Sequence, residues 1–173
     1  MSAMTFPAEL TIRLARATDT PAILAFIREL AEYEKLLDQV VADESALRAT
    51  LFEGRPAAEV LIAELAGAPV GFALFFPSYS TFLAKPGLYL EDLFVRPAAR
   101  GKGVGAALMS ACARIAVERD YGRFEWSVLD WNEPALRFYR DLGALPLAEW
   151  TMQRLTGAPL AALAGRWTQD VAP

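Results

Sequence analysis

The stretch LYLEDLFVRPAARGKGVGA, residues 88–106, decides the fold of this chain. It begins with an apolar, strand-like run, Leu88–Val95, which is interrupted only by the acidic pair Glu91 and Asp92. Alternating glycines follow, and from Gly103 to about Glu118 the apolar residues recur at helical spacing. The stretch therefore predicts a strand, a glycine-rich turn and a helix in direct succession.

The glycine-rich turn has the properties of a phosphate-binding site. Glycines allow positive φ angles and leave no Cβ to block a ligand, while the first turn of the following helix offers unpaired N–H groups and the positive end of its dipole. Two cationic side chains add positive charge beside these groups. The residues expected to hold the phosphates are Arg100, Gly101, Lys102, Gly103, Val104, Gly105 and Ala106.

Two other phosphate motifs compete for this turn. A Walker-type loop ends in Gly-Lys-Ser/Thr, which Gly105-Ala106-Ala107 does not supply. The dinucleotide fingerprint is formally matched by Gly101-x-Gly103-x-x-Ala106, with Asp130 after the next strand in the place of a ribose-binding acid. However, that fold opens with its motif and continues through several βα units. Here three strands are expected before the turn and one βα unit after it, so we rank this alternative second.

The rest of the chain predicts the order β-α-α-β-β-β-α-β-α-β, with a polar loop over Ser78–Gly87. This order indicates an α/β protein with a mixed, mostly antiparallel sheet flanked by helices. We expect a single domain over residues 1–173, with a core at about 10–155 and an undefined tail at 156–173. The expected strands are 10–14, 59–65, 70–76, 88–95, 124–128 and 147–155, and the expected helices are 21–34, 43–51, 103–118 and 132–142.

Composition excludes several classes of function. The chain has no histidine, which removes Ser-His-Asp and Cys-His catalysis and the commonest zinc ligand, so no metal is expected. A net charge of −4 argues against a nucleic-acid partner. One cysteine, no leader-like N-terminus and no long apolar stretch predict a soluble protein of the cytoplasm with no membrane partner. The lone Cys112 is expected in the core.

The glycine turn resembles the Arg/Gln-x-x-Gly-x-Gly/Ala acetyl-CoA motif of the GNAT N-acetyltransferase superfamily. Three further segments resemble its spermidine/spermine (diamine) acetyltransferase group: residues 29–34, ELAEYE; residues 88–95, LYLEDLFV; and residues 131–140, WNEPALRFYR. Ser80 and Phe82 stand where polyamine enzymes of the group typically carry Asp and Trp, so the thialysine acetyltransferase branch is the nearest match. The resemblance implies the GNAT acyl-CoA N-acyltransferase fold, acetyl-CoA as co-substrate, a small cationic amine substrate and a homodimer.

The same resemblance assigns roles to residues outside the turn. It implies that pantetheine pairs with the backbone of Leu93, Phe94 and Val95, and that acetyl-CoA also contacts Asn132, Glu133, Pro134, Ala135 and Tyr139. It places the amine against Tyr33, Glu34, Ser80, Glu91, Glu125, Trp126, Ser127 and Glu149.

Acetyl transfer requires a neutral amine and a proton for the departing thiolate. The resemblance makes Tyr139 the acid that protonates the sulfur and Glu91 the base. An ordinary carboxyl group and an alkylammonium differ by about 6 pKa units, so the base must act on an amine with a lowered pKa or through water. Strand alternation places the side chains of Glu91 and Asp92 on opposite faces, so only one of them is expected to face the substrate. A peptide N-acetyltransferase and a non-catalytic acetyl-CoA-binding module remain the alternatives.

Overall fold

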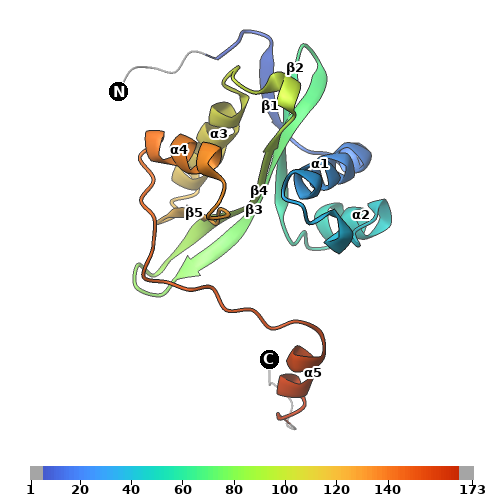
Figure 1. Ribbon diagram of the computed structural model, residues 1–173, viewed down its shortest axis with the longest axis vertical. Helices are drawn as coiled ribbons and strands as arrows, with labels where there is room; N and C mark the ends of the chain where they lie inside the picture. The colour runs from blue at the N-terminus through green and yellow to red at the C-terminus, as the bar shows by residue number, and fades with distance from the viewer. Residues whose placement is uncertain (1–5, 168–173) are drawn as a thin grey trace. The chain divides into compact units, whose positions relative to one another are not determined.

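The computed structural model describes residues 6–167 of the chain (Figure 1), and these divide into two compact units between residues 127 and 128. The first unit contains β1 (Leu10–Leu14), α1 (Thr20–Tyr33), α2 (Glu44–Phe52), β2 (Glu59–Leu65), β3 (Ala68–Ser80), β4 (Lys85–Val95), α3 (Val104–Glu118) and β5 (Phe124–Trp126). The second unit contains α4 (Glu133–Asp141) and α5 (Gly157–Ala164).

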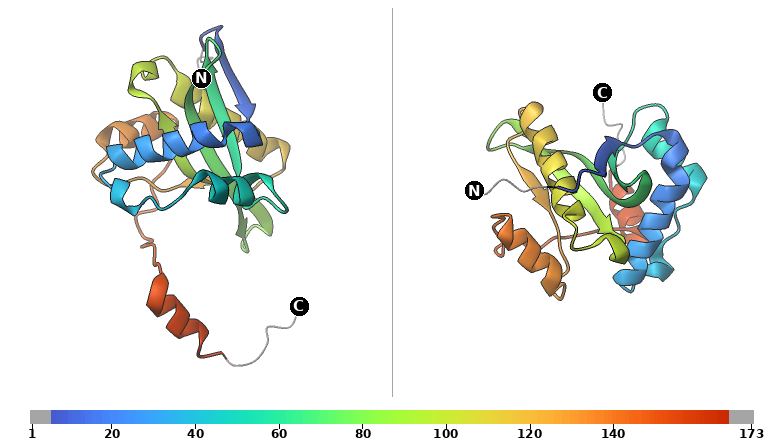
Figure 2. Two further views of the ribbon diagram at one scale, coloured as in Figure 1. Left: turned by 90° about the vertical axis from the view of Figure 1, so that its right-hand side faces the viewer. Right: turned by 90° about the horizontal axis from the view of Figure 1, so that it is seen from above.

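The sheet of the first unit has the order β1-β2-β3-β4-β5. Each strand from β1 to β4 pairs antiparallel with the next, and β5 alone pairs parallel with β4. Helices α1 and α2 cover one face of the sheet and α3 covers the other (Figures 1 and 2). An antiparallel meander followed by one crossover helix confirms the mixed α/β architecture and contradicts the dinucleotide-binding alternative, which needs several parallel units.

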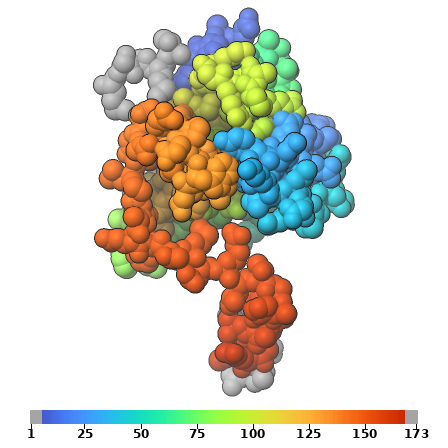
Figure 3. Space-filling model, in the orientation of Figure 1, coloured from blue at the N-terminus to red at the C-terminus, as the bar shows by residue number. Residues whose placement is uncertain are grey.

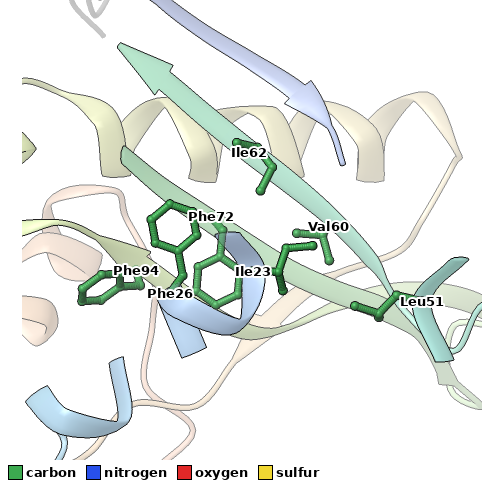
Figure 4. Packing of buried hydrophobic residues seen from close by; sticks show 7 residues of the cluster. All are labelled: Ile23, Phe26, Leu51, Val60, Ile62, Phe72 and Phe94. Atoms are coloured by element: carbon green, nitrogen blue, oxygen red, sulfur yellow. The ribbon is translucent and has the colours of Figure 1, made fainter. Parts of the chain in front are cut away.

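The core between α1 and the sheet is aromatic (Figure 4). Phe26 from α1 stacks on Phe72 from β3 with ring centroids 5.5 Å apart, and Phe94 of β4 meets the Phe26 ring at 6.3 Å. Ile23 and Ile62 complete this layer with no exposed surface. Buried aromatic pairs fix α1 against β3 and β4, which determines where the C-terminal end of α1 lies.

The pairing of β3 with β4 slips by one residue at the acidic pair. Leu74 lies opposite Asp92, but Phe75 lies opposite Leu90, so Glu91 is the extra residue of a β-bulge. Beyond this point β4 changes its surroundings. Residues 88–90 pair with both β3 and β5, whereas residues 91–95 pair with β3 alone among the described strands.

Two sequence expectations about length and pairing are wrong. The expected loop over Ser78–Gly87 is mostly strand, because β3 and β4 continue their antiparallel pairing out to Ser80 and Lys85. The expected last strand over residues 147–155 is also absent: between α4 and α5 the described chain forms turns and irregular backbone. A strand needs a neighbour to satisfy its backbone groups, and the second unit provides none among its described residues.

Most other elements begin and end where local signals place them. The Asp43 carboxylate accepts a hydrogen bond from the Ala46 N–H at 2.8 Å, which caps α2. Asn132 Oδ1 accepts from the Ala135 N–H at 3.3 Å at the start of α4. Gly143, with a φ of 87°, follows the end of α4 in the left-handed conformation expected there. The undefined tail contains α5 up to Ala164, and its residues 168–173 lie outside the described range.

Candidate active site

The glycine turn lies on the surface of the first unit, between β4 and α3 (yellow-green in Figure 3). Gly101 and Gly103 have φ angles of 72° and 79°, which L side chains rarely adopt. An added Cβ on Gly101 would meet no atom within 4 Å, so this glycine is required by its backbone angle and open space lies beside it. Gly103 is the N-cap of α3, and helix geometry leaves the N–H groups of the next residues, 104–106, without intrahelical acceptors. The turn therefore fits a phosphate group.

The two cations of the turn behave differently. Lys102 is exposed beside the uncapped end of α3. The Arg100 side chain instead turns back toward the sheet, where its Nε donates a hydrogen bond to the Val95 carbonyl at 2.9 Å. Its guanidinium carbon lies 5.0 Å from the ring centroid of Tyr33 and 5.7 Å from that of Phe94. The sequence correctly placed both charges at the turn, but it could not show which way each one points.

The second half of β4 presents a backbone edge next to the turn. Residues 91–95 have β3 on one side and no described strand on the other. The side chain of Phe94 is buried in the aromatic core, so this strand is held firmly while its outer edge stays available. An extended ligand such as a pantetheine arm can pair with such an edge as an added strand would.

The bulge brings both acidic side chains to one face of the sheet. Asp92 lies opposite Leu74, whose side chain packs into the core beneath α1. Glu91 follows the buried Leu90 with ordinary alternation, which directs it to the same face. The expectation that the two carboxylates face opposite sides is therefore wrong, because alternation fails where a strand has an extra residue.

A third carboxylate belongs to this group. Glu34 is the C-cap residue of α1, and burial raises its pKa. Burial raises the pKa of Asp92 from 3.8 to about 6, and repulsion from Glu91 and Glu34 adds to the rise. Glu91 itself is exposed. Asp92 was missed as a site residue because the one-residue slip that redirects it leaves no mark in the apolar pattern.

Tyr89 was also missed. Its hydroxyl lies 2.8 Å from the Ser127 Oγ, and its ring contacts that of Phe76 with centroids 5.3 Å apart. The contact between the Tyr89 and Ser127 hydroxyls connects β4 to the residue that follows β5, at the point where the two strands separate. Ser127 thus reaches the predicted amine side of the sheet with a partner that sequence spacing did not indicate.

The remaining predicted amine contacts are dispersed within the first unit. Glu125 forms an ion pair with Arg123 at 2.7 Å, and Trp126 packs its ring on that of Phe124 with centroids 4.9 Å apart. Ser80 is only 5% exposed, and its Oγ accepts a hydrogen bond from the Leu83 N–H at 3.3 Å. From the bulge, Ser80 lies about 20 Å further along β3. The structure therefore does not bring Ser80 together with the acidic group.

The second unit positions the proposed acid on a short helix. Tyr139 lies on α4, where its ring contacts that of Phe138 with centroids 5.3 Å apart. Glu133 and Pro134 occupy the first turn of this helix, and Glu133 lies 3.9 Å from Arg140. Glu149 is exposed in a turn after the helix.

Two further observations bear on chemistry. Cys112 has no exposed surface, and burial raises the pKa of its thiol to about 12, so it lies in the core as expected and is a poor nucleophile. Among residues 6–167, no three His, Cys, Asp or Glu side chains are grouped so as to hold a metal ion. The helices within that range are too short or too polar to cross a bilayer.

Comparison with known proteins gives a consistent result. The model of the acetyltransferase (GNAT) family matches residues 24–144. The chain is 41% identical to a thialysine N-epsilon-acetyltransferase of Sus scrofa, covering 92% of this chain and 99% of that protein. It is 37% identical to an L-ornithine N5-acetyltransferase of Arabidopsis thaliana, covering 88% and 86% respectively. A solved integron cassette protein from the mobile metagenome of V. cholerae superposes with a TM-score of 0.77 at 26% identity, covering 91% of this chain and 99% of that one.

Proposed function

Because the chain belongs to the GNAT acetyltransferase family and is an N-acetyltransferase, we propose that it acetylates a primary amine of a small cationic molecule. The proposed substrates are thialysine, lysine- or ornithine-like amino acids, with diamines and polyamines as weaker alternatives. The observation that carries this proposal is the bulge of β4, which puts two carboxylates on one face beside an open strand edge that leads into the glycine turn.

The acidic group supplies the selectivity for a cation. Glu34, Glu91 and Asp92 give this face a concentrated negative charge, which attracts an ammonium group and a second positive charge on the same small molecule. Family members use acetyl-CoA as co-substrate. In the proposal the N–H groups of residues 104–106 and the Lys102 ammonium hold its phosphates, while the edge of residues 93–95 holds its pantetheine arm.

Three proton transfers complete the reaction. Glu91, the exposed carboxylate, removes one proton from the ammonium group through water, and the neutral nitrogen then attacks the thioester carbonyl. Tyr139 donates a proton to the departing sulfur, and the second proton, lost by the acetylated nitrogen, returns to the Tyr139 phenolate through water. The charges of Glu34 and Asp92 favour the ammonium form of the bound amine, so they aid capture and oppose deprotonation. We therefore assign them to binding and Glu91 to proton removal.

The proposal keeps the single N-acetyltransferase domain over residues 1–173 that the sequence predicts. Its proposed base, Glu91, belongs to the first unit and its proposed acid, Tyr139, to the second. A homodimer is also part of the proposal, and it rests on the family resemblance alone. The proposed cytoplasmic location rests on the sequence, which has a single cysteine.

The test is a turnover screen with acetyl-CoA. Release of free CoA is followed with thialysine, lysine, ornithine, diamines, polyamines, aminoglycosides and peptides with free amino termini. We expect the highest kcat/KM with one of the cationic amino acids. Faster turnover of peptides would replace the proposal with peptide acetylation, and tight acetyl-CoA binding without turnover of any amine would indicate a non-catalytic module.

A further inference from the structure

Arg100 has contacts that its position in the glycine turn does not explain. A side chain that binds a phosphate should point toward the uncapped end of α3. Lys102 is exposed and can point there. Arg100 instead donates from Nε to the carbonyl of Val95, the last residue of β4. Its guanidinium lies over the ring of Tyr33, the last residue of α1.

These contacts join the ends of two elements that the proposed reaction uses differently. The end of β4 belongs to the acetyl-CoA side, and the end of α1 belongs to the amine side, with Tyr33 directly before Glu34. A guanidinium is permanently charged, planar and able to lie on an aromatic face while it donates hydrogen bonds from its edge. Arg100 makes both kinds of contact at once.

A neighbouring arginine shows that this role differs from simple fastening of α1. Arg96 forms a bidentate pair with Glu29 and also donates to the carbonyl of Pro69, so it fixes the middle of the helix to β3. Its guanidinium lies over the core ring of Phe26. Helix α1 is therefore already held in place through Arg96 and the core, and Arg100 acts on its last residue only.

We propose that Arg100 is a positioning residue. It holds the Tyr33 side chain, beside the proposed amine site, in a fixed position relative to Val95 at the end of β4, where the proposed acetyl-CoA site lies. This inference rests on the proposed function and deepens it. The two cationic residues of the turn then have different roles: Lys102 binds the phosphates of acetyl-CoA, and Arg100 positions Tyr33 on the amine side. Loss of Arg100 raises KM for the amine and lowers kcat, and leaves acetyl-CoA binding nearly unchanged.

The experiment compares Arg100→Leu and Arg100→Lys with Lys102→Met and with Arg48→Leu, which removes an exposed arginine of α2 as a charge control. For Arg100→Leu we expect a five- to tenfold rise in amine KM and less than a twofold change in the acetyl-CoA dissociation constant from calorimetry. Lys102→Met should do the reverse and reduce the salt dependence of acetyl-CoA binding. Arg100→Lys keeps the charge but not the planar group, so it should resemble Arg100→Leu.

A double-mutant cycle with Tyr33→Leu isolates the contact itself. We expect the two substitutions to be non-additive in amine KM and in the unfolding midpoint, while Arg48→Leu and Tyr33→Leu add. The unfolding cycle needs no turnover, so it still tests the contact if the wild-type protein acetylates no amine and the proposed function fails. Additive effects in both readouts, or an Arg100→Leu variant that weakens acetyl-CoA binding while Arg100→Lys restores it, would overturn the inference.

Discussion

Two parts of β4, residues 88–90 (the closed half) and residues 91–95 (the open half), differ in their pairing. Residues 88–90 lie between β3 and β5, with Leu88 and Leu90 buried, and they hold the sheet together. Among the described strands, residues 91–95 pair with β3 alone; this part begins with a bulge and carries two carboxylates. The proposed chemistry is assigned to the part of β4 where regular pairing stops, because an incompletely paired strand can offer both its backbone edge and redirected side chains to a ligand.

The largest expected effect is on the open half. Glu91→Gln removes the proposed base without changing the size of the side chain, so kcat/KM for the best amine should fall about 10³-fold, or about 4 kcal/mol of transition-state stabilisation. Steady-state kinetics above and below neutral pH measure this fall, and the urea midpoint should not move. A loss of less than tenfold would assign proton removal to another group.

The closed half should respond in the opposite way. Leu88→Ala removes a side chain with no exposed surface, and its cavity should lower the free energy of unfolding by about 3 kcal/mol. Turnover per folded molecule should stay close to that of the wild type. Urea unfolding measures the free energy of unfolding, and active-site titration gives the turnover per folded molecule. The comparison variant is Leu93→Ala, at a half-buried position of the open half.

The ionised carboxylate of Asp92, in the open half of β4, should lower the free energy of unfolding. Its pKa is about 6 in the folded protein against 3.8 ordinarily, so the folded state binds the proton more tightly than the unfolded state. The free energy of unfolding contributed by this group therefore falls as pH rises from about 4 to about 6, by about 2 kcal/mol after allowance for solvent screening.

Asp92→Asn removes that dependence. The variant should be more stable than the wild type at pH 8 by about 2 kcal/mol, with little difference at pH 4, while its amine KM rises. Urea titrations of both proteins at several pH values provide the measurement. A variant that is equally destabilised at all pH values would mean that the Asp92 carboxylate is a structural hydrogen-bonding group instead.

The smallest effect is expected far from the bulge. Ser80→Ala removes the acceptor of the Leu83 N–H in the β3–β4 hairpin and should lower stability by about 1 kcal/mol. Amine KM should change less than twofold, since Ser80 is buried at the far end of β3. A larger rise in KM would support the amine contact that the family resemblance implies for Ser80.

Sequence reasoning was reliable where a local rule determines the structure. The glycines of the turn and the helix starts near Asp43 and Asn132 each depend on a few neighbouring residues, and all of them are found where the sequence predicts them. The antiparallel order of the first strands also followed from short connections, such as the turn between β2 and β3.

It was unreliable where pairing between distant residues decides the result. The slip at Glu91 depends on the register of β3 against β4, which no periodicity within β4 reveals. The same pairing lengthens both strands into the expected loop. The absent strand at 147–155 is the opposite case, in which an apolar pattern has no described partner within its unit. The direction of the Arg100 side chain is likewise set by Tyr33, far away in the sequence.

The single cysteine determines what a thiol reagent can detect in this protein. Cys112 is fully buried between α3 and the sheet, and its thiol has a pKa of about 12, so the folded chain should be silent toward aromatic disulfides. Colour developed in such an assay then measures released CoA without a protein background. In the absence of substrates, the slow appearance of one reactive thiol per chain instead records how often α3 separates from the sheet.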